Sequence, residues 1–169
     1  WVFSSYIAAS AVAMSMTSWL AGRYGRKALY QVALVLFAAG LVLDTLATTS
    51  LQFVFARILQ GAASGPLGPL SLVVLLETQP PAQHGRVNLL WSLCFLIGIS
   101  SGPSIGGWLS EYHGWRSIFD VSLPVTAFIF VAMTLLLEEK RADRPRPFDF
   151  FGLATFSIGM IGLQMLLDR

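Results

Sequence analysis

Charged residues are scarce in this chain of 169 residues, where Asp, Glu, Lys and Arg together make up 12%. Soluble domains usually carry about 25%, and 55% of the residues here are hydrophobic. This deficit of charge predicts a membrane protein. The formal net charge is only +2, and the basic residues are scattered over short loops, so we expect no nucleic acid as a partner.

Cysteine is almost absent, since Cys94 is the single one. A disulfide within the chain is therefore excluded, and a thiol in an apolar run usually packs as a small hydrophobic group. His84 and His113 stand in predicted loops without neighbouring ligands, so we expect no metal site. The sequence also lacks a starting Met, and apolar runs reach Trp1 and nearly reach Arg169. We expect both ends to lie inside a longer protein.

Long apolar runs dominate the chain, and a helix needs roughly 20 apolar residues to cross a bilayer. The sequence predicts six such helices, at about residues 2–21, 29–48, 51–77, 87–109, 117–137 and 150–167. The predicted fold class is an all-α, polytopic transmembrane helical bundle. The alternative, a soluble helical bundle, would need polar helix faces that these runs lack. We expect the third run to form one long, bent helix despite its Gly and Pro residues.

Basic residues alternate between the two sets of loops. Eight lie in the loops near 22–28, 78–86 and 138–149, whereas the opposite side holds only Arg116 and Arg169. Cytoplasmic loops carry the excess of Lys and Arg, so we predict that these three loops are cytoplasmic. Aromatic residues that favour the membrane interface mark the other side: Trp1, Trp108, Tyr112 and Trp115.

Arg57 is the one basic residue well inside a predicted span, roughly 9 Å from its outer end at 1.5 Å per residue. A charge in hydrocarbon costs several kcal/mol unless it is solvated or paired, so we expect Arg57 to face the bundle interior or a water-filled cavity. Gln60 lies on the same helix face, and Gly61 and Gly65 form a small-residue contact for another helix. The alternative is that Arg57 extends to the outer headgroups.

The fourth span carries glycine at every fourth position. Gly98, Gly102 and Gly106 line one helix face, while Gly107 widens this stripe. Pro103 interrupts the hydrogen bonds of the helix. Close helix packing explains the glycine spacing but requires neither Pro103 nor Gly107, so the combination indicates a further role.

The first predicted cytoplasmic loop combines a turn glycine with positive charge, at Gly25, Arg26 and Lys27. These cations can meet helix C-terminal carbonyls and lipid phosphates, and the alternative role is a topology anchor. Asp44 and Glu77 lie near the ends of their spans, where we expect them to sit in water at the interface. The alternative for either residue is that it carries a proton.

Taken in order, the Gly-Arg-Lys loop, the Arg57-x-x-Gln60-Gly61 helix and the Gly102-Pro-x-x-Gly-Gly107 helix resemble the major facilitator superfamily. The likeness is greatest to its fourteen-helix drug:proton antiporters, the EmrB/QacA type, and covers essentially the whole chain. Further matching pieces are Gly65-Pro-Leu-x-Pro69-Leu-Ser71, Pro80-Pro81, Trp115-Arg-x-Ile-Phe119, Asp149-x-x-Gly152 and Leu167-Asp-Arg169.

The resemblance implies a partial major facilitator fold that comprises helices two to seven. Residues 1–137 would form helices two to six of the N-terminal bundle. Residues 138–149 would be a cytoplasmic linker, and residues 150–169 the first of two extra helices that link the bundles.

The resemblance also implies roles for the motifs. Arg57 and Gln60 would take part in proton coupling, and the glycine–proline segment of the fourth span would be the helix motif of antiporters. The loop residues Gly25, Arg26 and Lys27 would help set the balance between inward-facing and outward-facing states.

The expected function is proton-coupled export of drugs or other lipophilic small molecules by alternating access, in the plasma (inner) membrane. The expected partners are the lipophilic substrate, the lipid bilayer, helix one and the C-terminal bundle of the same protein, and an adaptor protein. No cofactor is expected, because the proton gradient drives transport. We expect the acid that responds to Arg57 to lie outside this sequence.

Other functions are weighed against these residues. An uptake carrier of the same superfamily is the nearest alternative, and the glycine–proline helix favours an exporter by resemblance. An intramembrane hydrolase needs a nucleophile and a base at membrane depth, whereas the predicted spans hold serines without histidine. A scaffold or channel subunit has no need to hold the charge of Arg57. We therefore expect a transporter and not an enzyme.

Overall fold

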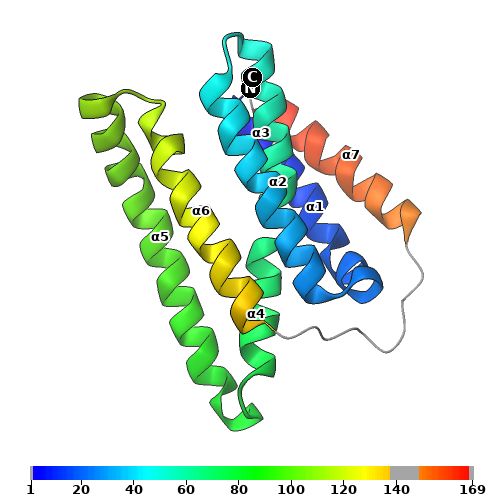
Figure 1. Cartoon of the computed structure of the whole chain (residues 1–169). Helices are drawn as coiled ribbons and strands as arrows, with labels where there is room; N and C mark the ends of the chain where they lie inside the picture. Colours follow the sequence, from blue (N-terminus) through cyan, green and yellow to red (C-terminus); the bar gives the residue numbers. More distant parts are fainter. Residues whose placement is uncertain (1, 138–148, 168–169) are drawn as a thin grey trace.

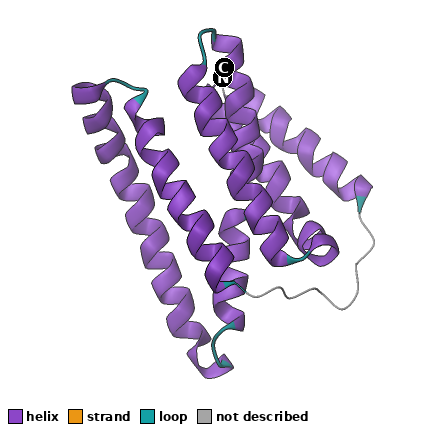
Figure 2. Ribbon diagram, viewed as in Figure 1, coloured by secondary structure: helices purple, strands orange, loops and turns teal. Residues whose placement is uncertain are grey.

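The computed structural model describes residues 2–137 and 149–167, and the regular structure in those ranges is helical (Figures 1 and 2). In chain order the elements are α1 (Val2–Tyr24), α2 (Arg26–Leu46), α3 (Ser50–Ser64), α4 (Leu67–Glu77), the short 3-10 helix η1 (Pro81–Gln83), α5 (His84–His113), α6 (Ser117–Leu136) and α7 (Phe150–Leu167). The all-α prediction is confirmed. Trp1, Arg169 and residues 138–148 of the predicted linker lie outside the described residues.

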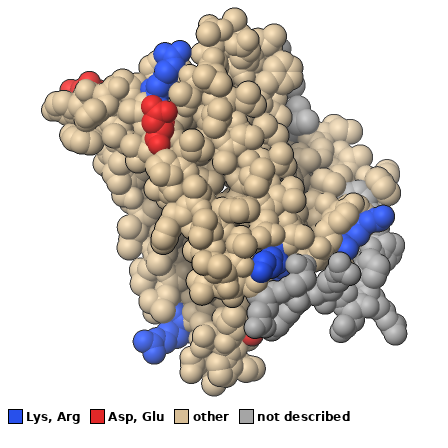
Figure 3. Space-filling view, viewed as in Figure 1, with Lys and Arg blue, Asp and Glu red and all other residues tan. Residues whose placement is uncertain are grey.

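Within the described residues, four helical segments are long and apolar enough to cross a membrane: Arg26–Leu46, Ser50–Glu77, Pro81–His113 and Ser117–Leu136. The other two predicted spans also form helices. Of these, α1 is long enough but carries six Ser and Thr residues, and the apolar part of α7 is shorter. Most of the surface visible in Figure 3 is neither acidic nor basic, as expected for helices that face lipid.

The third predicted span is interrupted, which corrects the expectation of one bent helix. It forms α3 and α4, separated by a turn at Gly65 and Pro66. Pro66 has no backbone N–H to donate into the preceding turn, so the regular ladder stops there. The two halves together still make a span of 28 residues.

The helix α3 packs against both α1 and α2, and α2 also packs against α6. Two glycines allow α1 and α3 to come close together. A Cβ atom at Gly61 would collide with the backbone carbonyl of Tyr6, and one at Gly65 with the carbonyl of Ser10. The predicted small-residue contact is therefore confirmed, with α1 as the partner helix.

The turns between helices alternate between two ends of the bundle (Figure 1). At one end lie Gly25 and the segment 78–83, and at the other lie the turns at 47–49 and 114–116. Gly25 and Gly114 have φ of 90° and 84°, which side chains rarely adopt, so glycine makes these turns without strain. By the charge rule of the sequence, the end with Gly25 is the cytoplasmic one.

Candidate functional site

Arg57 extends from α3 toward α2 and α6. Its Nη1 donates a 2.9 Å hydrogen bond to Gln60 Oε1, and its Nε lies 3.4 Å from Asp44 Oδ2. The guanidinium carbon lies 5.0 Å from the ring centre of Phe53 and 4.7 Å from that of Phe119. The side chain is 21% exposed. These contacts favour the interior position over extension to the headgroups, because Asp44, Gln60 and the two rings all belong to the bundle.

Asp44 is the acidic partner of Arg57, and its exposed fraction is 0%. The expectation that Asp44 sits in water at the interface is therefore wrong. The same contact places one acid beside Arg57 within this sequence. That the acid which responds to Arg57 lies outside the sequence stays a prediction. Arg57 reaches Asp44 because the turn at 47–49 makes α2 and α3 antiparallel neighbours. Arg57 lies further along the chain from this turn than Asp44 does, and the long arginine side chain covers that distance.

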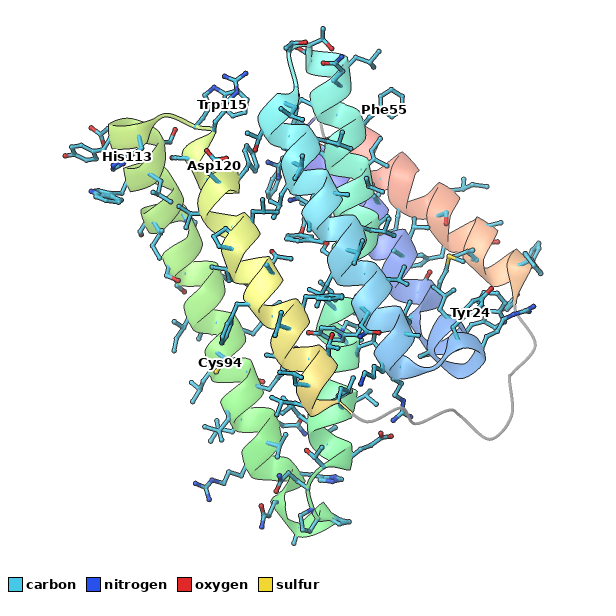
Figure 4. All side chains as sticks on the ribbon, viewed as in Figure 1. Tyr24, Phe55, Cys94, His113, Trp115 and Asp120 are labelled. Atoms are coloured by element: carbon cyan, nitrogen blue, oxygen red, sulfur yellow. The ribbon has the colours of Figure 1, made fainter. Side chains whose placement is uncertain are left out.

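Aromatic rings pack together beside Arg57, and Trp115 of this group lies at the 114–116 turn (Figure 4). The ring of Phe53 lies 5.6 Å from that of Trp115 and 6.0 Å from that of Phe119, both edge to face. Arg116 extends back to α2, where its Nε and Nη2 donate to the carbonyls of Thr45 (3.2 Å) and Ala47 (3.3 Å). Since the last carbonyls of a helix lack intrahelical partners, Arg116 ties this end of α2 to α6.

The predicted gating loop connects three helices at the opposite end. Arg26 forms an ion pair with Glu77 at the end of α4. Lys27 Nζ donates a 2.8 Å hydrogen bond to the backbone carbonyl of Thr134, two residues before α6 ends. A cation is favourable at a helix C-terminus, so the loop ties the start of α2 to the ends of α4 and α6. Glu77 is partly exposed, 37% of its side chain, as expected at an interface.

The glycine–proline segment lies on α5, which continues through Pro103 without a break. No residue of α5 is buried. A Cβ atom built at Gly98, Gly102 or Gly107 would meet no described atom within 4 Å, and one at Gly106 would only touch Ile118 at 3.9 Å. Packing against a described helix therefore does not account for the stripe.

The structure also bears on Cys94. Cys94 is exposed on α5, so it does not pack inside this bundle. The apolar residues next to Cys94 in the sequence predicted a buried thiol. These residues are exposed as well, because α5 lies at the edge of the described helices. Around His84 and His113, the described residues contain no group of three metal-binding side chains.

Sequence reasoning missed several partners of the predicted residues. It identified Arg57 and Arg26 but not the pairing with Asp44 and Glu77, and it missed Phe119. The available signal was the antiparallel hairpin: the short turn at 47–49 brings the end of α2 beside the start of α3. Phe119 could not be found this way, because its contact with Arg57 depends on where α6 packs.

Comparisons with known proteins agree with this architecture. A profile described as the Major Facilitator Superfamily matches residues 1–167. The chain is 34% identical over 171 residues to the multidrug export protein EmrB of Escherichia coli K12, and the match covers 100% of this chain and 33% of that protein. It is also 34% identical over 170 residues to the fatty acid resistance protein FarB of Neisseria gonorrhoeae, covering 100% of this chain and 34% of that protein.

Among solved structures, the chain is similar to the inward-open xylose transporter XylE from E. coli, with a TM-score of 0.66 and 19% identity. That match covers 98% of this chain and 43% of the other, and shows the fold alone. The chain spans about a third of the length of EmrB and FarB. The family profile, the apolar helices and the shared fold lead to one conclusion: this is a multi-pass membrane chain that belongs to the Major Facilitator Superfamily of transporters.

Proposed function

We propose that this chain is part of a proton-coupled transporter that exports lipophilic small molecules by alternating access. Its relatives EmrB and FarB are named for multidrug export and for fatty acid resistance. Fatty acids are lipophilic, so the name of FarB supports that substrate class here, and the name of EmrB supports export of drugs. The export direction is further supported by the glycine–proline helix, which resembles the motif of antiporters.

The observation that carries the proposal is the interior position of Arg57. A cation among apolar helices is costly, and this chain compensates it with Asp44, Gln60 and two aromatic rings. A scaffold gains nothing from such a group. In a proton-driven transporter, a buried cation can change its interactions when a nearby carboxylate binds a proton.

The other motifs have proposed roles in the conformational cycle. Gly25, Arg26 and Lys27 would stabilise one of the two transport states, because their bonds to Glu77 and Thr134 tie together the cytoplasmic ends of three helices. The open glycine stripe of α5 would face the C-terminal bundle, where small residues permit close and reversible contact.

The domain organisation follows from the same proposal. Residues 1–137 would belong to the N-terminal bundle, 138–149 would be the cytoplasmic linker, and 150–169 the first extra linking helix, in the plasma (inner) membrane. Asp149 already marks the start of α7, where its Oδ1 accepts a 2.8 Å hydrogen bond from the backbone of Gly152. Further partners would be the C-terminal bundle, helix one and an adaptor protein.

Everted membrane vesicles that carry the full-length protein test this function, with ethidium as a lipophilic probe. An acidified lumen should drive ethidium into the vesicles, and a protonophore should release it. An uptake carrier coupled to protons would move the probe in the opposite direction. If ethidium and a C16 fatty acid both fail to respond to the proton gradient, the proposed function is wrong.

A further inference from the structure

We propose that Asp44 is the proton-binding residue that controls Arg57: its carboxylate holds the guanidinium, and its protonated form releases it. This inference rests on the proposed proton-coupled transport. It assigns the coupling acid to the end of α2 within this chain.

The surroundings of Asp44 provide the first argument. Its side chain is fully buried, and neither Oδ1 nor Oδ2 accepts a hydrogen bond from any described residue. Buried carboxylates with a purely structural role usually accept several hydrogen bonds, because an ion without them is costly. Asp44 has only the single ion pair with Arg57, at 3.4 Å. A carboxyl held so loosely suits a group that alternates between its charged and neutral forms.

Arg57 supplies the second argument, because it has partners that do not depend on the charge of Asp44. Its Nη1 bonds to Gln60, and the faces of Phe53 and Phe119 attract the guanidinium. When Asp44 binds a proton, these contacts still compensate the cation. The ion pair can therefore break while Arg57 keeps other partners that compensate its charge.

Among the described residues, the other charged groups near this end form no ion pair with Asp44 or Arg57. Arg116 faces α2 from the α5–α6 turn but bonds to backbone carbonyls. Asp120, on the first turn of α6, is exposed (Figure 4). The charged residues of α1 and α4, Arg23 and Glu77, lie at the opposite end of those helices. Arg57 is thus the group that responds directly to the charge of Asp44.

The proposed route for the proton is a hollow that shares Phe53 with the surroundings of Arg57. A hollow of about 310 Å³ opens at the turn between α2 and α3, lined by the hydroxyl residues Thr48, Thr49 and Ser50 together with Phe53 and Arg116. Phe53 lines this hollow, and its ring centre also lies 5.0 Å from the guanidinium carbon of Arg57. A proton from water in the hollow would form the O–H bond of neutral Asp44, and its later release would restore the carboxylate and the ion pair. This end is the outer one by the charge rule, where protons enter an exporter.

Transport by Asp44 variants of the full-length protein in proteoliposomes tests the inference, with ethidium as the probe. Asp44→Asn removes the proton site, and a gradient cannot bias a conformational equilibrium without differential proton binding. We expect proton-driven ethidium accumulation to fall at least about tenfold, whereas gradient-free ethidium exchange stays within about twofold. Asp44→Glu should retain coupling, and the exposed acid Asp120 gives the matched control Asp120→Asn, which should behave as wild type.

Infrared spectroscopy gives a second test that needs no transport. Wild-type protein should show the C=O stretch of a protonated carboxyl that appears on acidification and is missing in Asp44→Asn. If wild type has no such band, or if Asp44→Asn retains proton-driven accumulation, the inference is overturned. If the band is present but wild type transports neither ethidium nor a C16 fatty acid, the proposed function fails while the proton site of Asp44 stands.

Discussion

Gly61 of α3 lies so close to the backbone carbonyl of Tyr6 in α1 that a Cβ atom has no room between them. Gly98 of α5 is the opposite case, because a Cβ there would meet no atom of another described helix within 4 Å. Both glycines belong to four-residue repeats. One repeat is a fixed packing contact of the bundle, and the other is an open surface.

The contrast predicts different effects of adding one methyl group. Gly61→Ala should lower the stability by about 1–3 kcal/mol, because α1 or α3 must shift to make room. Gly98→Ala, the matched control, should be neutral or stabilising by about 0.5–1 kcal/mol, since Ala favours the helix. The unfolding midpoints of the purified full-length variants in detergent measure this difference. Equal midpoints would show that the α1–α3 contact is looser than described.

A bulky residue in the open stripe should affect transport but not folding. Gly102→Leu has space in the described bundle, so the variant should insert and melt as wild type does. We expect loss of ethidium export, because the stripe would contact the C-terminal bundle during the cycle. Ser100→Leu, an exposed change two residues earlier on α5, is the control and should export normally. Export by Gly102→Leu at the wild-type rate would show that the glycine stripe has no role in transport.

Sequence alone predicted the helices and the motifs well but not the pairings between them. The apolar runs located the long helices, with α3 and α4 sharing one run, because a bilayer imposes helix length and apolarity directly. The spacing of Gly61 and Gly65 predicted a close contact. Pro66 was misjudged, since one proline can either bend or end a helix, and the outcome depends on the helices packed around it.

The candidate site was harder to predict for the same reason. The apolar surroundings of Arg57 marked it as a buried charge. Asp44, near the end of its helix, looked like an interfacial residue, but it is fully buried in a bundle where α3 and α6 pack against α2. Tertiary packing supplied the information that local sequence lacks.

The Arg26–Glu77 pair should shift the balance between the inward-facing and outward-facing states only modestly. Partly exposed ion pairs contribute about 1 kcal/mol or less, which changes an equilibrium by roughly fivefold at most. We expect Glu77→Gln to shift the balance between inward-facing and outward-facing states by up to this factor. Cysteine accessibility at the two ends of the full-length protein measures the shift. The charge exchange Arg26→Glu with Glu77→Arg should restore much of the wild-type balance, and a failure to do so would mean that the pair does not act through its charges.

The two partners of the buried pair should differ in their importance for stability. Arg57→Gln removes the ionic partner that buried Asp44 has among the described residues, which should cost about 3–5 kcal/mol. Asp44→Asn leaves Arg57 with Gln60 and two rings, so we expect a smaller loss of about 1–3 kcal/mol. The double variant should be more stable than Arg57→Gln alone. Thermal unfolding in detergent ranks the three variants, and a less stable double variant would contradict the pairing.

The most direct test of the account is the proton movement that accompanies ethidium transport by the full-length protein in proteoliposomes, followed with a pH-sensitive dye. Wild type should move protons against ethidium whenever ethidium is added. Arg57→Ala should move none, while Arg57→Lys keeps part of the signal because it keeps the charge. Ethidium-dependent proton movement that is unchanged in Arg57→Ala would contradict the role of the buried arginine.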